Sequence, residues 1–164
     1  MLPHDITITG ETPEDDDAIE ALHEAAFGPG RFARAAARLR EQGPHDPRLS
    51  LVARRGPGLA GSVRLTPIGV GAARGHLLGP LAVAPGSKNV GIGGALIERS
   101  CALAAETPGL FVLLVGDAPY YGRHGFAPVR GPHMPGPVDP ARLLVRWHGD
   151  PVPLAGRVRH ARRG

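Results

Sequence analysis

A glycine-rich segment in the middle of the chain joins an apolar run to a helical pattern, and no other feature restricts the fold as strongly. Residues 88–94 read Lys-Asn-Val-Gly-Ile-Gly-Gly and include the only lysine of the sequence. Apolar residues then recur at helical spacing from Ile92 to Ala104, which predicts a helix that starts within the glycines. Amides at a helix N-terminus have no intrahelical partner, and glycines let a ligand approach them. We therefore expect this segment to bind an anion.

The other patterns predict strands and helices in the order β, α, α, β, β, β, α, β, α, β. The expected strands cover residues 6–9, 49–55, 59–68, 75–84, 110–115 and 143–147. The expected helices cover residues 13–27, 31–42, 92–104 and 117–125. Adjacent strands without an intervening helix predict antiparallel pairing in the first half of a mixed α/β fold.

A Gly79-Pro80 pair interrupts the apolar run 75–84. Proline has no amide hydrogen to donate to a neighbouring strand. The pair therefore predicts a bulge, a sheet edge or a place where strand pairing stops.

Composition bounds the class of protein. The 164 residues include 24 Gly and 18 Pro, yet the apolar residues form periodic blocks, so we expect a packed core. We predict one domain over residues 1–150, followed by a basic tail, residues 151–164. We expect the tail to be frayed and solvated rather than to bind nucleic acid, because it lacks aromatic stacking residues. No secretory leader or apolar stretch of membrane-spanning length is visible, so we expect a cytoplasmic protein with no membrane partner.

Two familiar phosphate-binding patterns fit the glycine segment poorly. A P-loop requires a lysine directly after its last glycine, whereas Lys88 precedes the glycines. A dinucleotide fingerprint requires a third glycine where this chain has Leu96.

In a third register, Lys88, Gly91 and Gly93 occupy the fixed positions of the pattern Q/R-x-x-G-x-G/A. The segment in this register resembles the signature of the GNAT superfamily of acyl-CoA N-acyltransferases. Lys88 departs from the usual Gln or Arg, and the pair Asn89-Val90 is also unusual there. The resemblance implies that the backbone amides of the segment hold the pyrophosphate of acetyl-CoA. The implied cofactor-binding residues are Lys88, Asn89, Val90, Gly91, Ile92, Gly93 and Gly94.

A second element, Tyr120 to Phe126, resembles the F-Y-x-x-x-G-F element of the same family. Matching Gly125 and Phe126 places Tyr121 at the tyrosine that protonates the departing thiolate and Tyr120 at an aromatic packing position. The resemblance, which runs from about Ile6 to Trp147, also implies a GNAT-like mixed sheet, flanked by about four helices, whose fourth and fifth strands splay apart. The pantetheine arm of the cofactor would pair there with the backbone of Leu81, Ala82 and Val83.

The implied activity is transfer of the acetyl group of acetyl-CoA to a primary amine by direct attack. Tyrosine suits the general acid because its reference pKa of about 10 exceeds that of a thiol, about 8.5. No general base stands out among Glu24, His23, His76 and Asp117, and Asp117 also fits a helix cap. Cys101 is expected to be an inert interior thiol, and the histidines are too scattered for a metal site.

Several alternatives stay open. The same fold could be a non-catalytic acyl-CoA-binding or protein-interaction module. The acceptor could be a small amine, an antibiotic, a peptide N-terminus or a protein lysine, and homodimers are frequent in the family. Three arginines near the expected acceptor entrance could attract an anionic group, but we expect them to face water: Arg31, Arg34 and Arg38.

Overall fold

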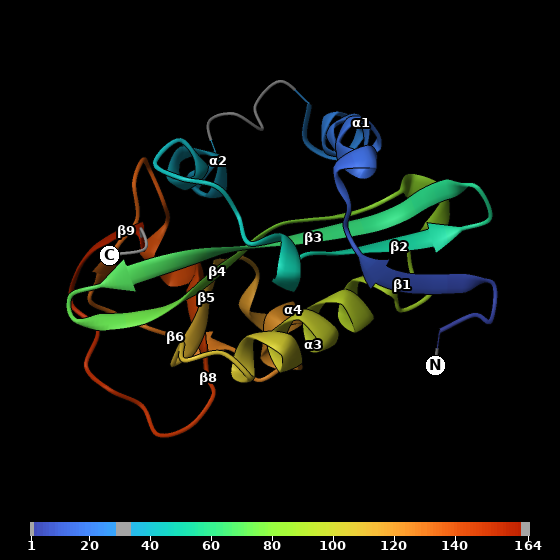
Figure 1. Ribbon diagram of the computed structural model, residues 1–164. Coiled ribbons are helices and arrows are strands. Elements are labelled where there is room, and N and C mark those ends of the chain that lie inside the picture. The colour runs from blue at the N-terminus through green and yellow to red at the C-terminus, as the bar shows by residue number, and fades with distance from the viewer. Residues whose placement is uncertain (1, 29–33, 162–164) are drawn as a thin grey trace.

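A nine-stranded mixed sheet forms the centre of the computed structural model, which describes residues 2–28 and 34–161 (Figure 1). The strands are β1 (Ile6–Gly10), β2 (Leu51–Arg55), β3 (Gly58–Val70), β4 (Ala73–Val83), β5 (Phe111–Val115), β6 (Ala127–Pro128), β7 (Pro132–His133), β8 (Leu143–Trp147) and β9 (Gly156–His160). The α-helices of the described residues are α1 (Asp16–Phe27), α2 (Ala35–Arg40), α3 (Ile92–Ala105) and α4 (Ala118–Gly122). Short 3₁₀ turns cover Pro13–Asp15, Pro47–Leu49, Pro85–Ser87 and Pro140–Arg142.

The main path of the sheet runs β1-β2-β3-β4-β5-β8-β6. Pairing is antiparallel from β1 to β4 and parallel between β4 and β5, and β5 pairs antiparallel with β8. The predicted mixed α/β class with an antiparallel first half is confirmed.

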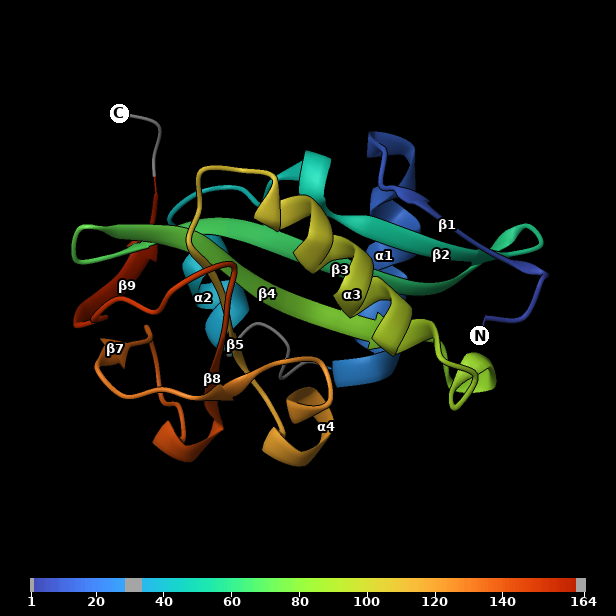
Figure 2. The same cartoon turned by 90° about the horizontal axis from the view of Figure 1, so that it is seen from below.

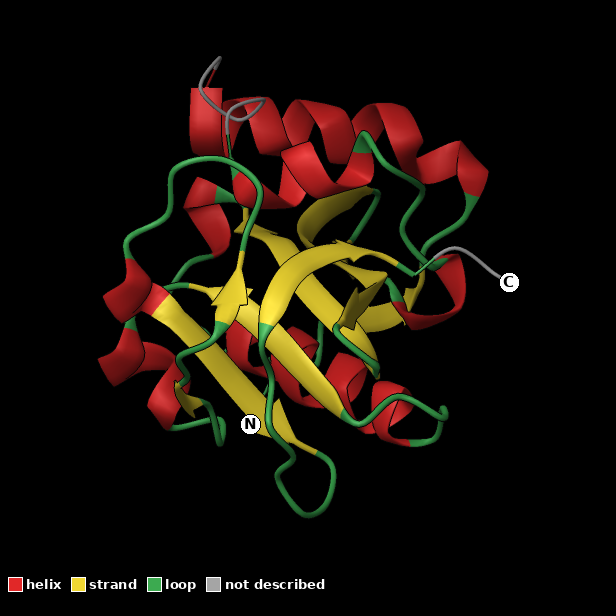
Figure 3. Cartoon of the chain, turned by 90° about the vertical axis from the view of Figure 1, so that its left-hand side faces the viewer, coloured by secondary structure: helices red, strands yellow, loops and turns green. Residues whose placement is uncertain are grey.

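Helices cover both faces of the sheet. Helices α1 and α2 lie on one face, and α3 and α4 lie on the other (Figures 1 and 3). One apolar cluster fills the space under α3, with Leu65, Leu96 and Val112 fully buried. A second cluster, around Leu39 and Phe111, lies beneath α2. The periodic apolar blocks of the sequence supply both clusters.

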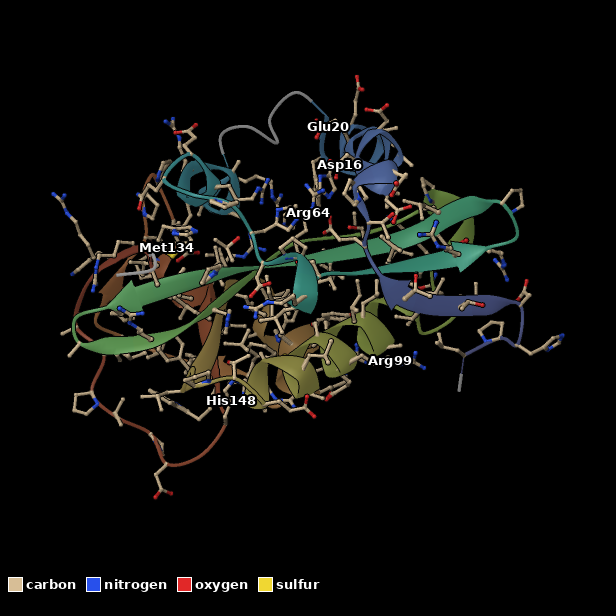
Figure 4. All side chains as sticks on the ribbon, viewed as in Figure 1. Asp16, Glu20, Arg64, Arg99, Met134 and His148 are labelled. Atoms are coloured by element: carbon tan, nitrogen blue, oxygen red, sulfur yellow. The ribbon has the colours of Figure 1, made fainter. Side chains whose placement is uncertain are left out.

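Ion pairs attach α1 and the segment before it to the sheet. The buried carboxylate of Asp15 accepts hydrogen bonds from the Thr12 amide at 2.9 Å and from Arg54 of β2 at 2.8 Å. Arg64 of β3 lies beneath α1 (Figure 4) and donates to Glu11 at 3.1 Å and to Asp16 at 3.3 Å. These contacts connect the first helix with the strands that it covers.

Two predictions about chain segments need correction, and two short strands were missed. The expected frayed tail is wrong for Gly156–His160, because these residues form β9, which pairs with the far end of β3 and with β7. The short strands β6 and β7 were not predicted, since their proline-containing sequences carry no alternation. The helix expected over residues 31–42 is found as Ala35–Arg40, and its expected start, with Arg31, lies outside the described residues.

Helix α3 approaches β3 closely at Gly61. A Cβ atom at this position would lie 2.9 Å from Cγ2 of Ile92 and 3.0 Å from Cδ1 of Leu96. Both neighbours are buried, so neither can move away freely. The absence of a side chain at Gly61 therefore sets the distance between α3 and the sheet.

We predict that Gly61→Ala lowers the free energy of unfolding by about 1–3 kcal/mol, because the added methyl overpacks the contact with α3. The matched control is Gly10→Ala in β1, where a Cβ would meet nothing within 4 Å. Urea denaturation, followed by circular dichroism, measures the free energy of unfolding of the wild type and of both variants. Equal stability of the two variants would contradict this account of the packing.

Candidate active site

Strands β4 and β5 pair over a short stretch and then separate. The bridged pairs are His76 with Val112 and Leu77 with Leu113. Beyond Leu77, β4 runs toward the start of α3 and β5 runs toward α4 (Figure 2). Residues 78–83 of β4 thus have β3 on one side and no strand on the other, and we call this second side the open edge of β4.

The alternation of an antiparallel pair fixes which main-chain groups face the open edge. The Ala84 amide donates to the Ala60 carbonyl at 2.8 Å, in register with the pair Ser62 and Ala82. Main-chain groups of successive residues point to opposite sides of a strand, so Ala82 faces β3. The amides and carbonyls of Leu81 and Val83 face the open edge. Of the three residues expected to pair with a ligand, two are thus oriented for it and Ala82 is not.

The Gly79-Pro80 pair coincides with this separation. Between Val63 and Leu65 of β3 the register shifts, because their partners on β4 are Leu81 and Leu78. Two residues along β3 therefore correspond to three along β4, which is a bulge. The predicted irregularity is confirmed.

The glycine segment leaves β4 through the 3₁₀ turn Pro85–Ser87 and enters α3 with two left-handed residues. Asn89 has φ 65° and Gly91 has φ 91°. Asparagine and glycine tolerate this region better than other residues, which accounts for the unusual Asn89. The first intrahelical hydrogen bond runs from the Ala95 amide to the Gly91 carbonyl at 3.1 Å. The amides at the start of α3 therefore have no partner within the helix.

The glycines do not all serve the same purpose. A Cβ at Gly91 would meet only Leu2 at 4.0 Å, so this residue is open to the outside. A Cβ at Gly93 would lie 2.8 Å from the hydroxyl oxygen of Tyr120, and one at Gly94 would lie 3.1 Å from the His124 ring. Gly93 and Gly94 thus make room for the α4 region, and the two motifs of the sequence are in contact.

A charged network holds α3 beside α4 and β8. Glu98 of α3 lies 2.9 Å from Nδ1 of His124 and accepts a hydrogen bond from Arg146 at 2.8 Å. Partial burial alone would raise the pKa of Glu98, but the hydrogen bonds from Arg146 and His124 outweigh it and lower this pKa. The ionised carboxylate therefore fixes the position of the second motif relative to the first.

A cavity of about 240 Å³ opens where β4 and β5 part. Residues 77–81 of β4, Val115 of β5 and Tyr121 of α4 form its walls, and Arg34 and Ala36 contribute from the α2 side. The segment from Met134 to Arg142 closes the remaining side. Sequence reasoning did not identify this segment as part of the site, because its prolines give no periodic signal.

Tyr121 is partly buried in this cavity. Its ring stands edge-on to Tyr120 and Phe126, with centroids 4.9 Å and 5.9 Å away. Burial raises the pKa of the Tyr121 hydroxyl, and Tyr120 adds to the increase, while the positive charges of Arg34 and Arg142 oppose it. The phenol therefore holds its proton at neutral pH.

The residues considered as general bases are dispersed. Glu24 is exposed on α1, and Asp117 occupies the N-cap position of α4 without a side-chain hydrogen bond. His23 lines a small pocket that residues of α1 and α2 form. His76 faces a separate cavity of about 690 Å³ at the other end of β4. None of the four lines the cavity that contains Tyr121.

Other chemistries find no support in the described part of the chain. Cys101 is buried, and burial raises its pKa to about 11, so the thiol stays protonated as expected. Residues 2–28 and 34–161 contain no cluster of three His, Cys, Asp or Glu side chains placed to hold a metal ion. None of their helices is long and apolar enough to cross a membrane.

Solved structures with this architecture include two acetyltransferases. The GNAT family N-acetyltransferase YhbS from Escherichia coli, in complex with CoA, aligns with a TM-score of 0.78 and 26% identity over 94% of this chain and 89% of its own. A GNAT family acetyltransferase from Brucella melitensis, in complex with acetyl-CoA, aligns with a TM-score of 0.72 and 27% identity over 98% of both chains.

Sequence similarity decides the family. The N-acetyltransferase YjhQ of Escherichia coli K12, itself described as uncharacterized, is 31% identical over 176 residues, which cover 98% of this chain and 95% of YjhQ. The chain belongs to the GNAT family of N-acetyltransferases. No family model matches it. The resemblance inferred from the two motifs is confirmed despite the unusual Lys88, which is exposed at the start of the glycine segment.

For this GNAT family member, the burial of Tyr121 can be measured directly. We predict that the tyrosinate absorbance of the wild type, minus that of Tyr121→Phe, titrates with a midpoint above pH 10. The physical reason is the desolvation of the hydroxyl in the cavity. A midpoint at or below pH 10 in the folded protein would contradict the burial described here.

Proposed function

We propose that this protein transfers the acetyl group of acetyl-CoA to a primary amine at the cavity between β4 and β5. The observation that carries the proposal is the meeting of three features at one gap. These are the unpaired main-chain groups of Leu81 and Val83, the free amides at the start of α3 and the protonated hydroxyl of Tyr121. The cofactors bound to the related structures from Escherichia coli and Brucella melitensis support acetyl-CoA as the donor.

The glycine segment would hold the diphosphate of the donor. Its amides are directed outward from the helix start, where the macrodipole favours negative charge. Gly91 is open to solvent, and exposed Lys88 adds a positive charge nearby. The open edge of β4 would pair with the amide groups of the pantetheine arm, in the way that an added strand does.

Tyr121 would act as the general acid. Acetyl-CoA supplies a thioester whose carbonyl carbon the amine attacks, and the departing sulfur needs a proton. Tyr121 retains its proton because of burial and lines the cavity where β4 and β5 part. A neutral phenol there can donate to a thiolate because its pKa is the higher of the two. We assign no general base, since none of the considered side chains lines the cavity.

Binding of the donor is the first test. We predict that acetyl-CoA raises the melting temperature of the wild type saturably and that Gly91→Glu weakens binding at least about tenfold, because the carboxylate repels the diphosphate. The matched control is Gly156→Glu, which has a similar positive φ of 114° and no atom within 4 Å but lies in β9. Titration calorimetry measures the affinity for acetyl-CoA of the wild type and of both variants. No binding by the folded wild type would overturn the proposal.

Transfer to an amine is the second test. We predict that Tyr121→Phe lowers kcat about 100- to 10,000-fold and leaves the affinity for acetyl-CoA unchanged, because only the proton donor is lost. Release of free thiol during incubation with an amine panel measures the rate. Saturable binding of acetyl-CoA without transfer to any amine would instead indicate a non-catalytic binding module.

A further inference from the structure

Two arginines from different segments of the chain line the cavity that contains Tyr121. Arg34 precedes α2, and Arg142 ends the 3₁₀ turn before β8. Neither has a carboxylate within 4 Å among the described residues. Five other arginines of the described residues pair with Asp or Glu: Arg48, Arg54, Arg55, Arg64 and Arg146. The cavity therefore contains unneutralised positive charge.

Arg142 is fixed beside the tyrosine. Its carbonyl accepts a hydrogen bond from the Gly116 amide at 2.9 Å, and its Nε donates to the Gly116 carbonyl at 3.4 Å. Gly116 has no room for a side chain because the Tyr121 ring lies against its α-carbon. Gly116 thus contacts both the Arg142 side chain and the Tyr121 ring. The remaining N–H donors of the Arg142 guanidinium are available to a ligand.

Arg34 is held by a contact with α1. Its guanidinium carbon lies 4.3 Å from the centroid of the Phe27 ring, so α1 supports it through a cation–π contact. The positive charges of Arg34 and Arg142 both reach the Tyr121 hydroxyl, because both oppose the increase of its pKa that burial causes. The expectation that Arg34 only faces water is therefore incomplete, since its side chain lines the cavity while remaining exposed.

One acidic group shares the cavity with the two arginines. Asp139 lines it, but an oxygen of its carboxylate already accepts the Ala141 amide at 3.0 Å, which caps the turn before β8. The balance of formal charge in the lining is therefore one positive charge. A volume of about 240 Å³ lies below the usual range for drug-sized ligands, so the acceptor portion that enters is small.

We infer that the acceptor is a small molecule that carries a carboxylate as well as its primary amine, and that Arg34 and Arg142 bind the carboxylate. The inference rests on the proposed acetyl transfer. An arginine fork binds a carboxylate in a bidentate, planar arrangement, which orients the rest of the molecule. With the carboxylate on the arginines, the amine of the same small molecule is kept within the cavity that contains Tyr121.

The test compares acceptors that differ only in the carboxylate. Amino acids with α- or ω-amino groups are each assayed with acetyl-CoA beside the corresponding carboxamide and the amine that lacks the carboxyl group. Rates are corrected for the fraction of neutral amine. We expect kcat/KM to be at least about tenfold higher for one or more of the amino acids than for their uncharged counterparts. Amines without a carboxylate that react as fast as or faster than every amino acid would overturn the inference.

Variants distinguish recognition of the carboxylate from a general loss of activity. Arg142→Gln and Arg34→Gln should each raise KM for the amino acid about tenfold, with unchanged KM for acetyl-CoA and a much smaller loss of rate with the uncharged amine. Arg142→Lys should recover part of the loss. Arg99→Gln is the matched control, because Arg99 is exposed on α3 and projects away from α2 (Figure 4). Equal losses with charged and uncharged acceptors would overturn the inference.

The outcomes also separate this inference from the proposed function. Wild type that binds acetyl-CoA and acetylates only amines without a carboxylate keeps the function and overturns the inference. If acetyl-CoA binds and no amino acid of the panel reacts, the inference is likewise overturned, and the proposed function then depends on whether an amine without a carboxylate reacts. Absence of acetyl-CoA binding overturns both, because the inference depends on the transfer reaction.

Discussion

The separation of β4 from β5 is the constraint on which the rest of the structure depends. Strand pairing stops after Leu77 and Leu113, which leaves the main-chain groups of Leu81 and Val83 without a strand partner. Buried backbone groups need hydrogen-bonding partners, so a gap in the middle of a sheet is stable only when water or a ligand can enter it. Pro80, which has no amide hydrogen, removes one donor that would otherwise need a partner at the separation. The cavity, Tyr121, Arg34 and Arg142 all lie around this gap.

Close packing through glycines brings the two motifs to the same gap. Gly61 lets α3 approach the sheet, and Gly93 and Gly94 let Tyr120 and His124 approach α3. Glu98 then connects α3 with Arg146 of β8. These contacts fix the start of α3, where an anion would bind, relative to Tyr121, where a proton would be donated. The relative positions of the start of α3 and Tyr121 are therefore set by close packing within the protein.

Much of the fold and part of the site could be predicted from the sequence, because local patterns specify them. Alternation and helical spacing predicted strands β1 to β5 and β8 and helices α1 and α3, and Gly79-Pro80 predicted the irregularity in β4. Long-range pairing left no such signal: β9 joins the end of β3 through register pairs such as Val70 with Val158. Arg142 lies in a proline-rich segment without periodicity, so only the folded chain brings it beside Tyr121. The alternation of β4, which orients Leu81 and Val83 but not Ala82 toward the gap, likewise required the observed register.

The central claim is that the gap between β4 and β5 and the start of α3 form one binding site for the donor. Two-dimensional ¹H–¹⁵N NMR of the isotopically labelled protein during a titration with CoA tests it residue by residue. The account predicts saturable shifts that are largest for the amides of Leu81, Val83 and Gly91 to Gly94. Saturable binding that leaves these amides unmoved and instead shifts the residues around the cavity at His76 would contradict it.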